Sequence, residues 1–335
     1  MKLYIILTIF LTLGSALVPF FASVDLSDSK NRTTTHIQAQ VTDDTESETA
    51  TKPSESVASI KVLRTGSGKI IEKEIFDYVK GSVAAEMPPT YEREALKAQA
   101  VACYTYALWL KNNSNSSALG GADVSDSPAN YQGFLDDDEL QDKWGEKYDE
   151  YMSAVTDAVN AVAGEFLQYN GEPIMACYHA ISTGKTESAE NAWETNVPYL
   201  QSVRADGDIL SPEVESSVDI TDEQFKKCAQ SLEGANLSKN RKKWVGNCKT
   251  TKSGYVTKIK IGGKDFTGSD VRSAFALKSP AFTVKKTDKG FHFNVRGYGH
   301  LVGMSQYSAD YMARQGSGYK DILLYFFKGA KLVKP

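Results

Sequence analysis

The sequence has 335 residues, of which 41% are hydrophobic and 10% aromatic, so it can build a sizeable folded core. Its formal net charge of -4 argues against a nucleic-acid partner, because such proteins normally present a concentrated basic face. The four cysteines contain no C-x-x-C pair, which excludes a disulfide scaffold and a zinc finger. Cys228 and Cys248 could still pair with each other, and the sequence leaves this open.

The N-terminus indicates export. Lys2 precedes an apolar run from Leu3 to Val24, which is long enough to cross a hydrocarbon core of ~30 Å. A cleaved signal peptide normally has a shorter core and a small-x-small end, so we expect a retained signal-anchor at residues 1–24. Residues 25–57 are rich in Ser, Thr, Asp and Glu and contain no aromatic residue. They cannot bury enough apolar surface to offset their chain entropy, which predicts a disordered linker.

The folded part begins near Ile60. Residues 60–63 and 70–75 are expected to be two strands around a glycine-containing turn. A short helix over 76–85 ends before Pro88, and Thr90 is expected to cap a long second helix. Helical spacing of apolar residues supports this second helix, with a stripe made of Leu96, Ala100, Cys103, Ala107 and Leu110.

Further elements follow a polar loop at 112–128. A helix from about Lys147 ends at Gly164, and Asn170-Gly171 predicts a tight turn in a hairpin of Phe166–Tyr169 with Pro173–Ala180. Later we expect a capping box at 221–224, strands at 255–261, 282–286 and 291–296, and a final helix at 306–315. These strands and helices show no regular βαβ rhythm, so the prediction is one α+β domain over residues 58–335.

Glu86 is the first residue with candidate chemistry. It ends an otherwise apolar helix directly before Met87-Pro88. Burial there would raise the pKa of its carboxyl, so that one group could donate a proton near neutral pH and later take one back. A solvent-facing residue at a helix end is the alternative interpretation.

His179 begins a second candidate segment, which continues with small hydroxyl residues and glycine through Gly184. Such a segment could bind sugar hydroxyls, or it could be an ordinary turn. Cys177 lies two residues earlier, but a cysteine nucleophile and its base normally come from separate elements, which disfavours a cysteine enzyme.

A third candidate segment, residues 297–307, has three glycines within its first seven residues. It allows close approach of a ligand but fits neither phosphate-loop nor dinucleotide spacing. His179 and His300 could share zinc, but no third ligand stands at a telling spacing, so no metal and no other cofactor are expected.

Together and in this order, these segments resemble the SpoIID/LytB family. The similarity rests on Glu86-Met87-Pro88, on Glu94 to Ala102, on Tyr178-His179 and on Gly299-His300 to Gln306. Smaller matches are Tyr131-Gln132, Gly268 with Arg272, and the closing segment from Ile322-Leu323 to Gly329. The resemblance covers roughly residues 58–335 and implies an extracytoplasmic domain of mixed strands and helices around a substrate cleft.

The resemblance implies a lytic transglycosylase. Such an enzyme cleaves the bond between N-acetylmuramic acid and N-acetylglucosamine in peptidoglycan strands, here ones stripped of stem peptides. Glu86 would be its acid and base. The 6-hydroxyl of the muramic acid would attack C1 and leave a 1,6-anhydro end, so no second carboxylate is needed. The positions implied to bind sugar are Lys97, Gln99, Gln132, His179, Ser182, Gly184, His300, Ser305 and Gln306.

Three positions depart from the family pattern. Tyr104 stands where the family usually has arginine, Thr183 replaces the first glycine of Ser-Gly-Gly, and Leu301 replaces the central glycine of Gly-His-Gly-Val-Gly. Leu301 could narrow the cleft. The stretch from Ser125 to Tyr131 lacks the cysteine and histidine ligands that some relatives carry, which argues against zinc.

Three other functions remain open. A non-catalytic glycan-binding enhancer could recruit or stimulate a cell-wall amidase. A muramidase would need a second carboxylate, for which Glu94, Glu187 and Glu190 are the candidates, and a peptidase would use Cys177. The resemblance also implies a place at the sporulation septum during engulfment. There the anchor would hold the protein in the cell membrane, with stage II sporulation proteins P and M as partners.

Overall fold

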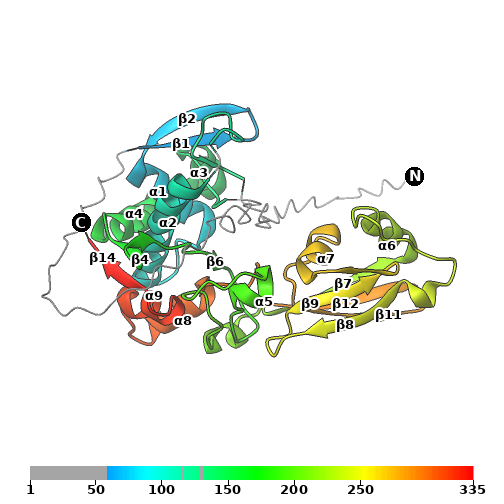
Figure 1. Cartoon of the computed structure of the whole chain (residues 1–335). Helices are drawn as coiled ribbons and strands as arrows, with labels where there is room; N and C mark the ends of the chain where they lie inside the picture. Colours follow the sequence, from blue (N-terminus) through cyan, green and yellow to red (C-terminus); the bar gives the residue numbers. More distant parts are fainter. Residues whose placement is uncertain (1–58, 115, 128–130, 335) are drawn as a thin grey trace, which may run out of the picture.

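The computed structural model describes residues 59–114, 116–127 and 131–334. Figure 1 shows two lobes of mixed helices and strands, which agrees with the α+β fold expected from the sequence. Each lobe has its own hydrophobic core, so the expected single domain over 58–335 contains two cores. The first lobe comprises residues 59–211 and 298–334, and the second lobe comprises residues 215–296.

The signal-anchor expected at 1–24 and the linker expected at 25–57 lie outside the described residues. Within the described ranges, no helix has the length and apolar character needed to cross a membrane.

The first lobe is mainly helical. Its N-terminal sheet pairs two antiparallel strands, with a short third strand parallel to the first: β1 (Ser59–Arg64), β2 (Lys69–Glu74) and β3 (Val124–Ser125). The first four helices are α1 (Ile75–Glu86), α2 (Arg93–Asn113), α3 (Asp137–Trp144) and α4 (Tyr148–Ala161). The sequence predicted β1, β2, α1, α2 and α4 close to these bounds but missed β3 and α3.

Helix α2 is the centre of the first lobe, where it contacts α1, α4 and two C-terminal helices. The predicted stripe from Leu96 to Leu110 is buried. The predicted cap at Thr90 is wrong, because Glu92 occupies the N-cap position and makes no side-chain cap. Instead, the Glu92 N–H donates to Asp310 Oδ1 at 2.7 Å, so a distant carboxylate satisfies this end of the chain.

The predicted hairpin forms only in part. Strand β4 (Phe166–Tyr169) pairs with β5 (Glu172–Pro173) across the Asn-Gly turn, but β5 is only two residues long. The continuous strand expected up to Ala180 is therefore wrong. Tyr178 and His179 form a separate strand, β6 (Tyr178–His179), which pairs in parallel with β13 (Met304–Ser305).

The remaining elements of the first lobe follow β6 and return from the second lobe. They are α5 (Ala189–Trp193), η3 (Asp206–Leu210), α8 (Gln306–Arg314), α9 (Tyr319–Phe326) and β14 (Lys331–Val333). Helix α8 matches the predicted helix at 306–315, whereas α9 was not expected. Strand β14 pairs with β4, so the C-terminal chain closes the sheet of the first lobe.

The second lobe packs two helices against two three-stranded sheets around buried phenylalanines. The sheets have the orders β11-β12-β7 and β10-β9-β8. Their strands are β7 (Glu215–Thr221), β8 (Val245–Thr250), β9 (Val256–Ile261), β10 (Lys264–Phe266), β11 (Phe282–Lys286) and β12 (Gly290–Arg296). The helices are α6 (Asp222–Ala229) and α7 (Gly268–Ala274), and the predicted capping box opens α6.

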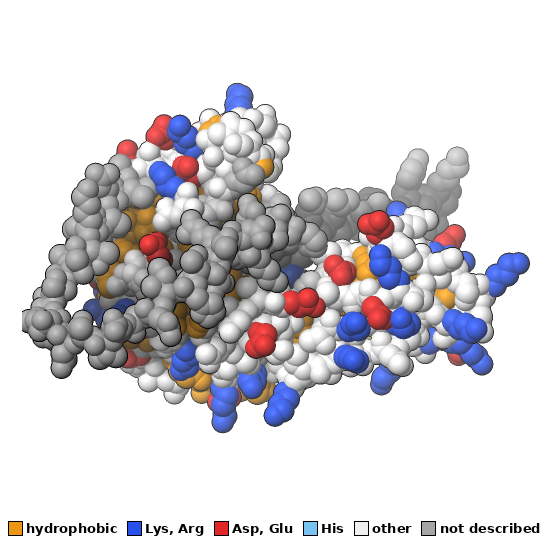
Figure 2. All heavy atoms as spheres, viewed as in Figure 1, with side chains coloured by type: hydrophobic (Ala, Val, Ile, Leu, Met, Phe, Trp, Pro, Cys, Tyr) orange, Lys and Arg blue, Asp and Glu red, His pale blue; other side chains and the backbone are white. Residues whose placement is uncertain are grey.

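The second lobe is basic. Residues 215–296 contain seventeen lysines and arginines but eight aspartates and glutamates, although the whole chain has a net charge of -4. Figure 2 shows these basic side chains spread over the visible face of this lobe. The lobe therefore presents a surface that suits an anionic ligand.

Glu187 connects the two lobes. Its carboxylate is 2% exposed and accepts hydrogen bonds from Thr251 Oγ1 at 2.7 Å and Ser253 Oγ at 2.5 Å, both in the second lobe. Its other oxygen accepts from the Ser188 N–H and from Asn191 Nδ2 in the first lobe. A buried carboxylate with four donors holds the lobes in one arrangement.

Candidate active site

Glu86 is the last residue of α1. The helix ends there because Met87 precedes a proline, which disfavours helical angles, and Met87 is extended with φ -120° and ψ 139°. Lys143 of α3 lies against this helix end, since its Nζ donates to the carbonyls of Ala84 at 3.1 Å and Ala85 at 3.4 Å. The chain thus places a carboxylate and a lysine at the same helix end.

The Glu86 side chain is partly buried, and its Oε1 accepts a hydrogen bond from the Gly133 N–H at 2.5 Å. Burial raises the pKa of this carboxyl, whereas the Gly133 N–H and the positive charge of Lys143 lower it. Desolvation is the largest of these effects, so the pKa lies above its ordinary value. Such a carboxyl can hold a proton closer to neutral pH than a solvated glutamate can.

The three glutamines implied to bind sugar form a buried network. Gln99, Gln132 and Gln306 are at most 4% exposed. Gln306 Nε2 donates to Gln99 Oε1 at 3.3 Å, and Gln99 Nε2 donates to Cys103 Sγ at 3.3 Å. Gln132 bonds to the hydroxyls of Tyr78 and Tyr178 and to the Cys103 carbonyl. In the described structure these amides bind protein groups and hold the wall beside Glu86.

His179 and His300 lie side by side, with ring centroids 5.8 Å apart. His179 Nδ1 bonds to the Val302 carbonyl, and His300 Nδ1 accepts from the Val302 N–H. Both rings are buried, which lowers both pKa values, so the pair is neutral at pH 7. Trp193 packs 5.7 Å from His300, and no printed group bonds to the buried Nε2 of His179.

Asp208 brings together the predicted serines. Its Oδ1 accepts from Ser305 Oγ at 2.7 Å and Ser308 Oγ at 2.9 Å, while its Oδ2 accepts from the Ser182 N–H at 2.7 Å. Ser305 is also the N-cap of α8. Gly184 lies beside Ser182, since its N–H donates to Ser182 Oγ at 3.2 Å. Asp208 was not singled out in the sequence, where it is one of many surface-type acidic residues.

Lys97 is the predicted sugar-binding residue that stands apart from these groups. Its Nζ pairs with Glu94 Oε1 at 2.6 Å and lies 5.5 Å from the Tyr319 ring centroid. Glu94 Oε2 accepts from the Tyr319 N–H as well. Lys97 therefore joins α2 to the start of α9 in this structure.

Of the candidate second carboxylates, Glu187 and Glu94 are both engaged in the contacts described above, whereas Glu190 is exposed on α5. The cysteine alternative is disfavoured for a physical reason. Cys177 is 2% exposed, and burial raises the pKa of its thiol, which opposes the nucleophilic thiolate. Cys228 and Cys248, whose pairing the sequence left open, are both free.

Two of the family departures lie in the cores. Tyr104 is 5% exposed and packs between Phe76 and Phe166, at centroid distances of 5.4 and 6.5 Å. Leu301 is fully buried with Tyr255 and Ala281, so its expected narrowing of a cleft is wrong. It has φ 70°, the left-handed region where the family glycine would be unstrained.

The cavities found in the described part of the chain include one of about 480 Å³ in the second lobe and one of about 240 Å³ beside Phe134. Neither is lined by Glu86 or by a predicted sugar-binding residue, so the substrate cleft at Glu86 stays a prediction. Over the described ranges, no group of three or more His, Cys, Asp and Glu residues is arranged to hold a metal.

Sequence reasoning missed two residues that touch the Glu86 region, Gly133 and Lys143. Gly133 follows Gln132 directly, and a Cβ there would lie 3.0 Å from Glu86 Oε1. Its signal was therefore the glycine beside a motif glutamine. Lys143 has no comparable signal, because it is one of many lysines in the sequence.

Comparison with known proteins agrees with this arrangement. A family model described as Stage II sporulation protein (SpoIID) matches residues 64–169, which include Glu86 and Gly133. Stage II sporulation protein D of Bacillus subtilis is 36% identical over 83% of this chain and 79% of its own length. The protein of that name from Bacillus amyloliquefaciens is 32% identical over the same shares. An amidase enhancer of Bacillus subtilis is 27% identical over 76% of this chain and 40% of its own length. The chain belongs to the SpoIID family.

Proposed function

We propose that this protein is a lytic transglycosylase that cleaves peptide-stripped peptidoglycan strands during sporulation. The single observation that carries the proposal is the Glu86 carboxyl, which is partly buried, has a raised pKa and is held by the Gly133 N–H. The relatives named stage II sporulation protein D supply the sporulation context.

The reaction needs one residue that first donates and then accepts a proton. Protonated Glu86 gives its proton to the glycosidic oxygen as the bond from C1 of N-acetylmuramic acid breaks. The resulting carboxylate then removes the proton of the 6-hydroxyl, whose oxygen bonds to C1. The products are a 1,6-anhydro end and a new N-acetylglucosamine end, and Glu86 is protonated again. Because the nucleophile belongs to the substrate, its effective concentration is high without an activated water.

The basic second lobe supports a stripped strand as the substrate. Removal of a stem peptide leaves a free lactyl carboxylate on each muramic acid. A lobe with seventeen basic and eight acidic side chains attracts such a polyanion. Anchoring through residues 1–24, a site at the septal membrane, and stage II sporulation proteins P and M as partners belong to the same proposal.

The test compares the parent protein with Glu86→Gln on purified peptide-free strands, with Glu190→Gln as a matched control at an exposed carboxylate. Mass spectrometry identifies the new ends. Anhydro ends from the parent and the control, with a loss of about 10²- to 10⁴-fold in Glu86→Gln, support the proposal. Reducing ends would instead indicate a muramidase.

The second candidate function is a glycan-binding enhancer that recruits or stimulates an amidase. The observation that favours it is the similarity to the amidase enhancer, although the chain spans only 40% of that protein. Equal strand binding by the parent and Glu86→Gln, without cleavage by either, would support this second function.

A further inference from the structure

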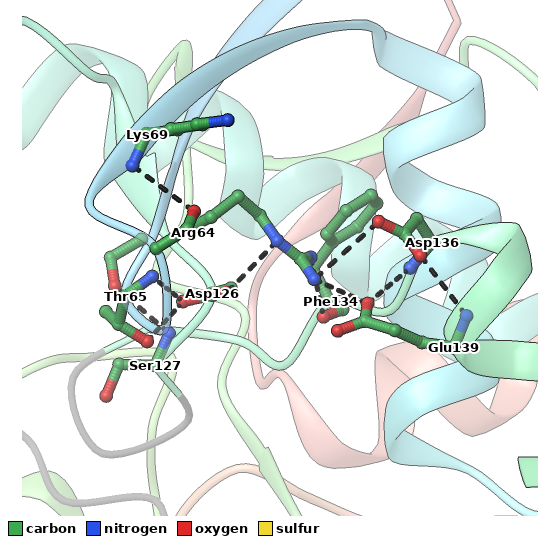
Figure 3. A network of polar contacts seen from close by, with 10 residues as sticks. Arg64, Thr65, Lys69, Asp126, Ser127, Phe134, Asp136 and Glu139 are labelled. Carbon is green, nitrogen blue, oxygen red and sulfur yellow. Dashed lines mark hydrogen bonds and ion pairs between the residues drawn. The ribbon is translucent and has the colours of Figure 1, made fainter. Parts of the chain in front are cut away.

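Arg64 is the centre of a polar network at the end of β1, shown in Figure 3. Its guanidinium is bound to three carboxylates, at 2.5 Å from Glu139 Oε2, 3.4 Å from Asp126 Oδ2 and 3.7 Å from Asp136 Oδ2. It also donates to the Phe134 carbonyl at 3.5 Å and stands 5.3 Å from the centroid of that ring. With only 14% of its side chain exposed, Arg64 is a largely buried cation among carboxylates.

The first set of contacts fixes the chain next to Gly133. Phe134 directly follows Gly133, and its ring lies between the Arg64 guanidinium and the Tyr78 ring, 5.3 Å from each centre. Asp126, on the other side of Gly133 in sequence, also accepts from the Thr65 N–H at 2.9 Å and from Thr65 Oγ1 at 2.7 Å. Arg64 therefore ties both flanks of Gly133 to the end of β1.

The second set of contacts fixes α3. Asp136 is the N-cap of this helix, and Asp136 with Glu139 forms its capping box. Both members of the box pair with Arg64. The same helix carries Lys143, whose Nζ binds the carbonyls of Ala84 and Ala85 at the end of α1. Because a short helix moves as a unit, the position of its N-terminus governs where Lys143 lies.

Both sets of contacts converge on Glu86. Through Phe134, Arg64 holds the N–H that donates to Glu86 Oε1, and through α3 it holds the nearby ammonium group. Without Arg64, Asp126, Asp136 and Glu139 would be three neighbouring carboxylates with no shared cation. Their mutual repulsion would separate the Asp126 side of the network from the start of α3.

We propose that Arg64 is a positioning residue for Glu86, which it serves by holding the Gly133 N–H and the Lys143 ammonium against the end of α1. The proposal rests on the proposed role of Glu86 as acid and base. It assigns no contact between Arg64 and the substrate.

The other titratable groups that act on Glu86 are neutral at pH 7. They are Tyr78 of α1, Cys103 and Tyr106 of α2, and Tyr178 of β6, and burial raises the pKa of each. Lys143 is the charged group that acts on the Glu86 carboxyl. Its displacement, together with that of the Gly133 N–H, should therefore raise the pKa of Glu86 further.

The experiment compares Arg64→Ala with Arg241→Ala. Arg241 is a matched control in the second lobe, since it pairs with Asp222 at 2.5 Å, donates to two carbonyls and stands 5.1 Å from the Phe291 ring centroid. The pKa of the Glu86 carboxyl is measured by NMR titration, which needs no activity. Steady-state cleavage of stripped strands then gives kcat and KM.

We expect Arg64→Ala to raise the pKa of Glu86 and to lower kcat by about 10- to 100-fold with little change in KM, the size typical of a displaced catalytic group. Arg241→Ala should leave the pKa and kcat at parental values. An unchanged pKa of Glu86 in folded Arg64→Ala would overturn the proposal.

Two milder variants keep the proposal testable if Arg64→Ala does not fold. Arg64→Lys keeps the charge but loses the planar fork, and Glu139→Gln removes one carboxylate partner. Each should raise the pKa of Glu86 by less than Arg64→Ala would, and parental values in both would refute the assignment. If the parent cleaves nothing, the proposed function fails, and the NMR titration still decides whether Arg64 positions Glu86.

Discussion

Gly133→Ala separates the chemistry of Glu86 from the stability of the fold. The new Cβ would lie 3.0 Å from Glu86 Oε1 and 3.4 Å from Ala85 Cβ, so the carboxyl must move by a few tenths of an ångström. A displacement of about 1 Å at a reacting group costs on the order of 100-fold in rate, so we expect a loss of roughly 3- to 10-fold in kcat. Gly133 does not have a left-handed φ, so alanine can adopt its backbone. Replacing such a glycine restricts the unfolded chain and stabilises by about 0.4–1 kcal/mol, which offsets the local crowding.

The assay measures kcat for anhydro-end formation beside urea unfolding of the same preparations. Gly66→Ala is the matched control, because no atom lies within 4 Å of a Cβ at that position and its φ is also ordinary. We expect Gly133→Ala to unfold within about 1 kcal/mol of the parent while losing activity, and Gly66→Ala to keep full activity. Parental kcat in Gly133→Ala would refute the close contact between Gly133 and Glu86 as a requirement for catalysis.

Four further predictions concern stability and binding. Leu301→Gly should destabilise by about 1–4 kcal/mol in urea, since the lost burial against Tyr255 exceeds the relieved left-handed strain, and a more stable variant would contradict this. Glu86 has a raised folded pKa, so its contribution to stability is full below pH 4.5 and is lost as pH rises through the folded value. Glu86→Gln should therefore unfold at higher urea than the parent at pH 8 and lose that advantage near pH 4. His179 and His300 have lowered folded pKa values, so their contribution is present above pH 6.5 and falls by about 1.4 kcal/mol per pH unit per histidine below it, which His179→Asn should halve in thermal scans. Binding of stripped strands should weaken steeply between low and high salt, whereas salt-independent binding would exclude the basic lobe as their contact.

Local sequence signals predicted local structure well. The turn between β1 and β2, the break of α1 at Pro88 and the capping box at Thr221 each depend on residues within a few positions of one another. Thr90 failed as a cap although its residue type suits one, because Asp310 reaches the start of α2 from 218 residues away. Such tertiary partners leave no trace in a local pattern.

The short strands around the candidate site failed for a similar reason. The sequence suggested that Tyr178 and His179 continue the hairpin strand from Pro173. Their actual partner is β13, which lies more than a hundred residues later and also brings Ser305 to this place. The two cores were equally hidden, because the second lobe is inserted between segments of the first and its apolar residues look like a continuation of one domain.

The candidate site shows what a family resemblance can and cannot provide. It selected Gln99, Gln132 and Gln306 as sugar-binding residues, and these amides bind one another and the neighbouring tyrosine and cysteine side chains. Residue identity alone does not separate a group that touches the ligand from a group that holds the wall behind it, because both are polar and both require a defined position.

The network also explains why Glu86 can have a perturbed environment at the end of a short helix. Gln132 ties the chain before Gly133 to α1 and α2, and Arg64 ties the chain after it to β1 and α3. Gly133 is thus held from both sides, so its N–H keeps its direction when the Glu86 carboxyl gains or loses a proton. A carboxyl that alternates between acid and base needs such fixed surroundings, since surroundings that relaxed with each proton transfer would stabilise both forms equally and add to the barrier between them.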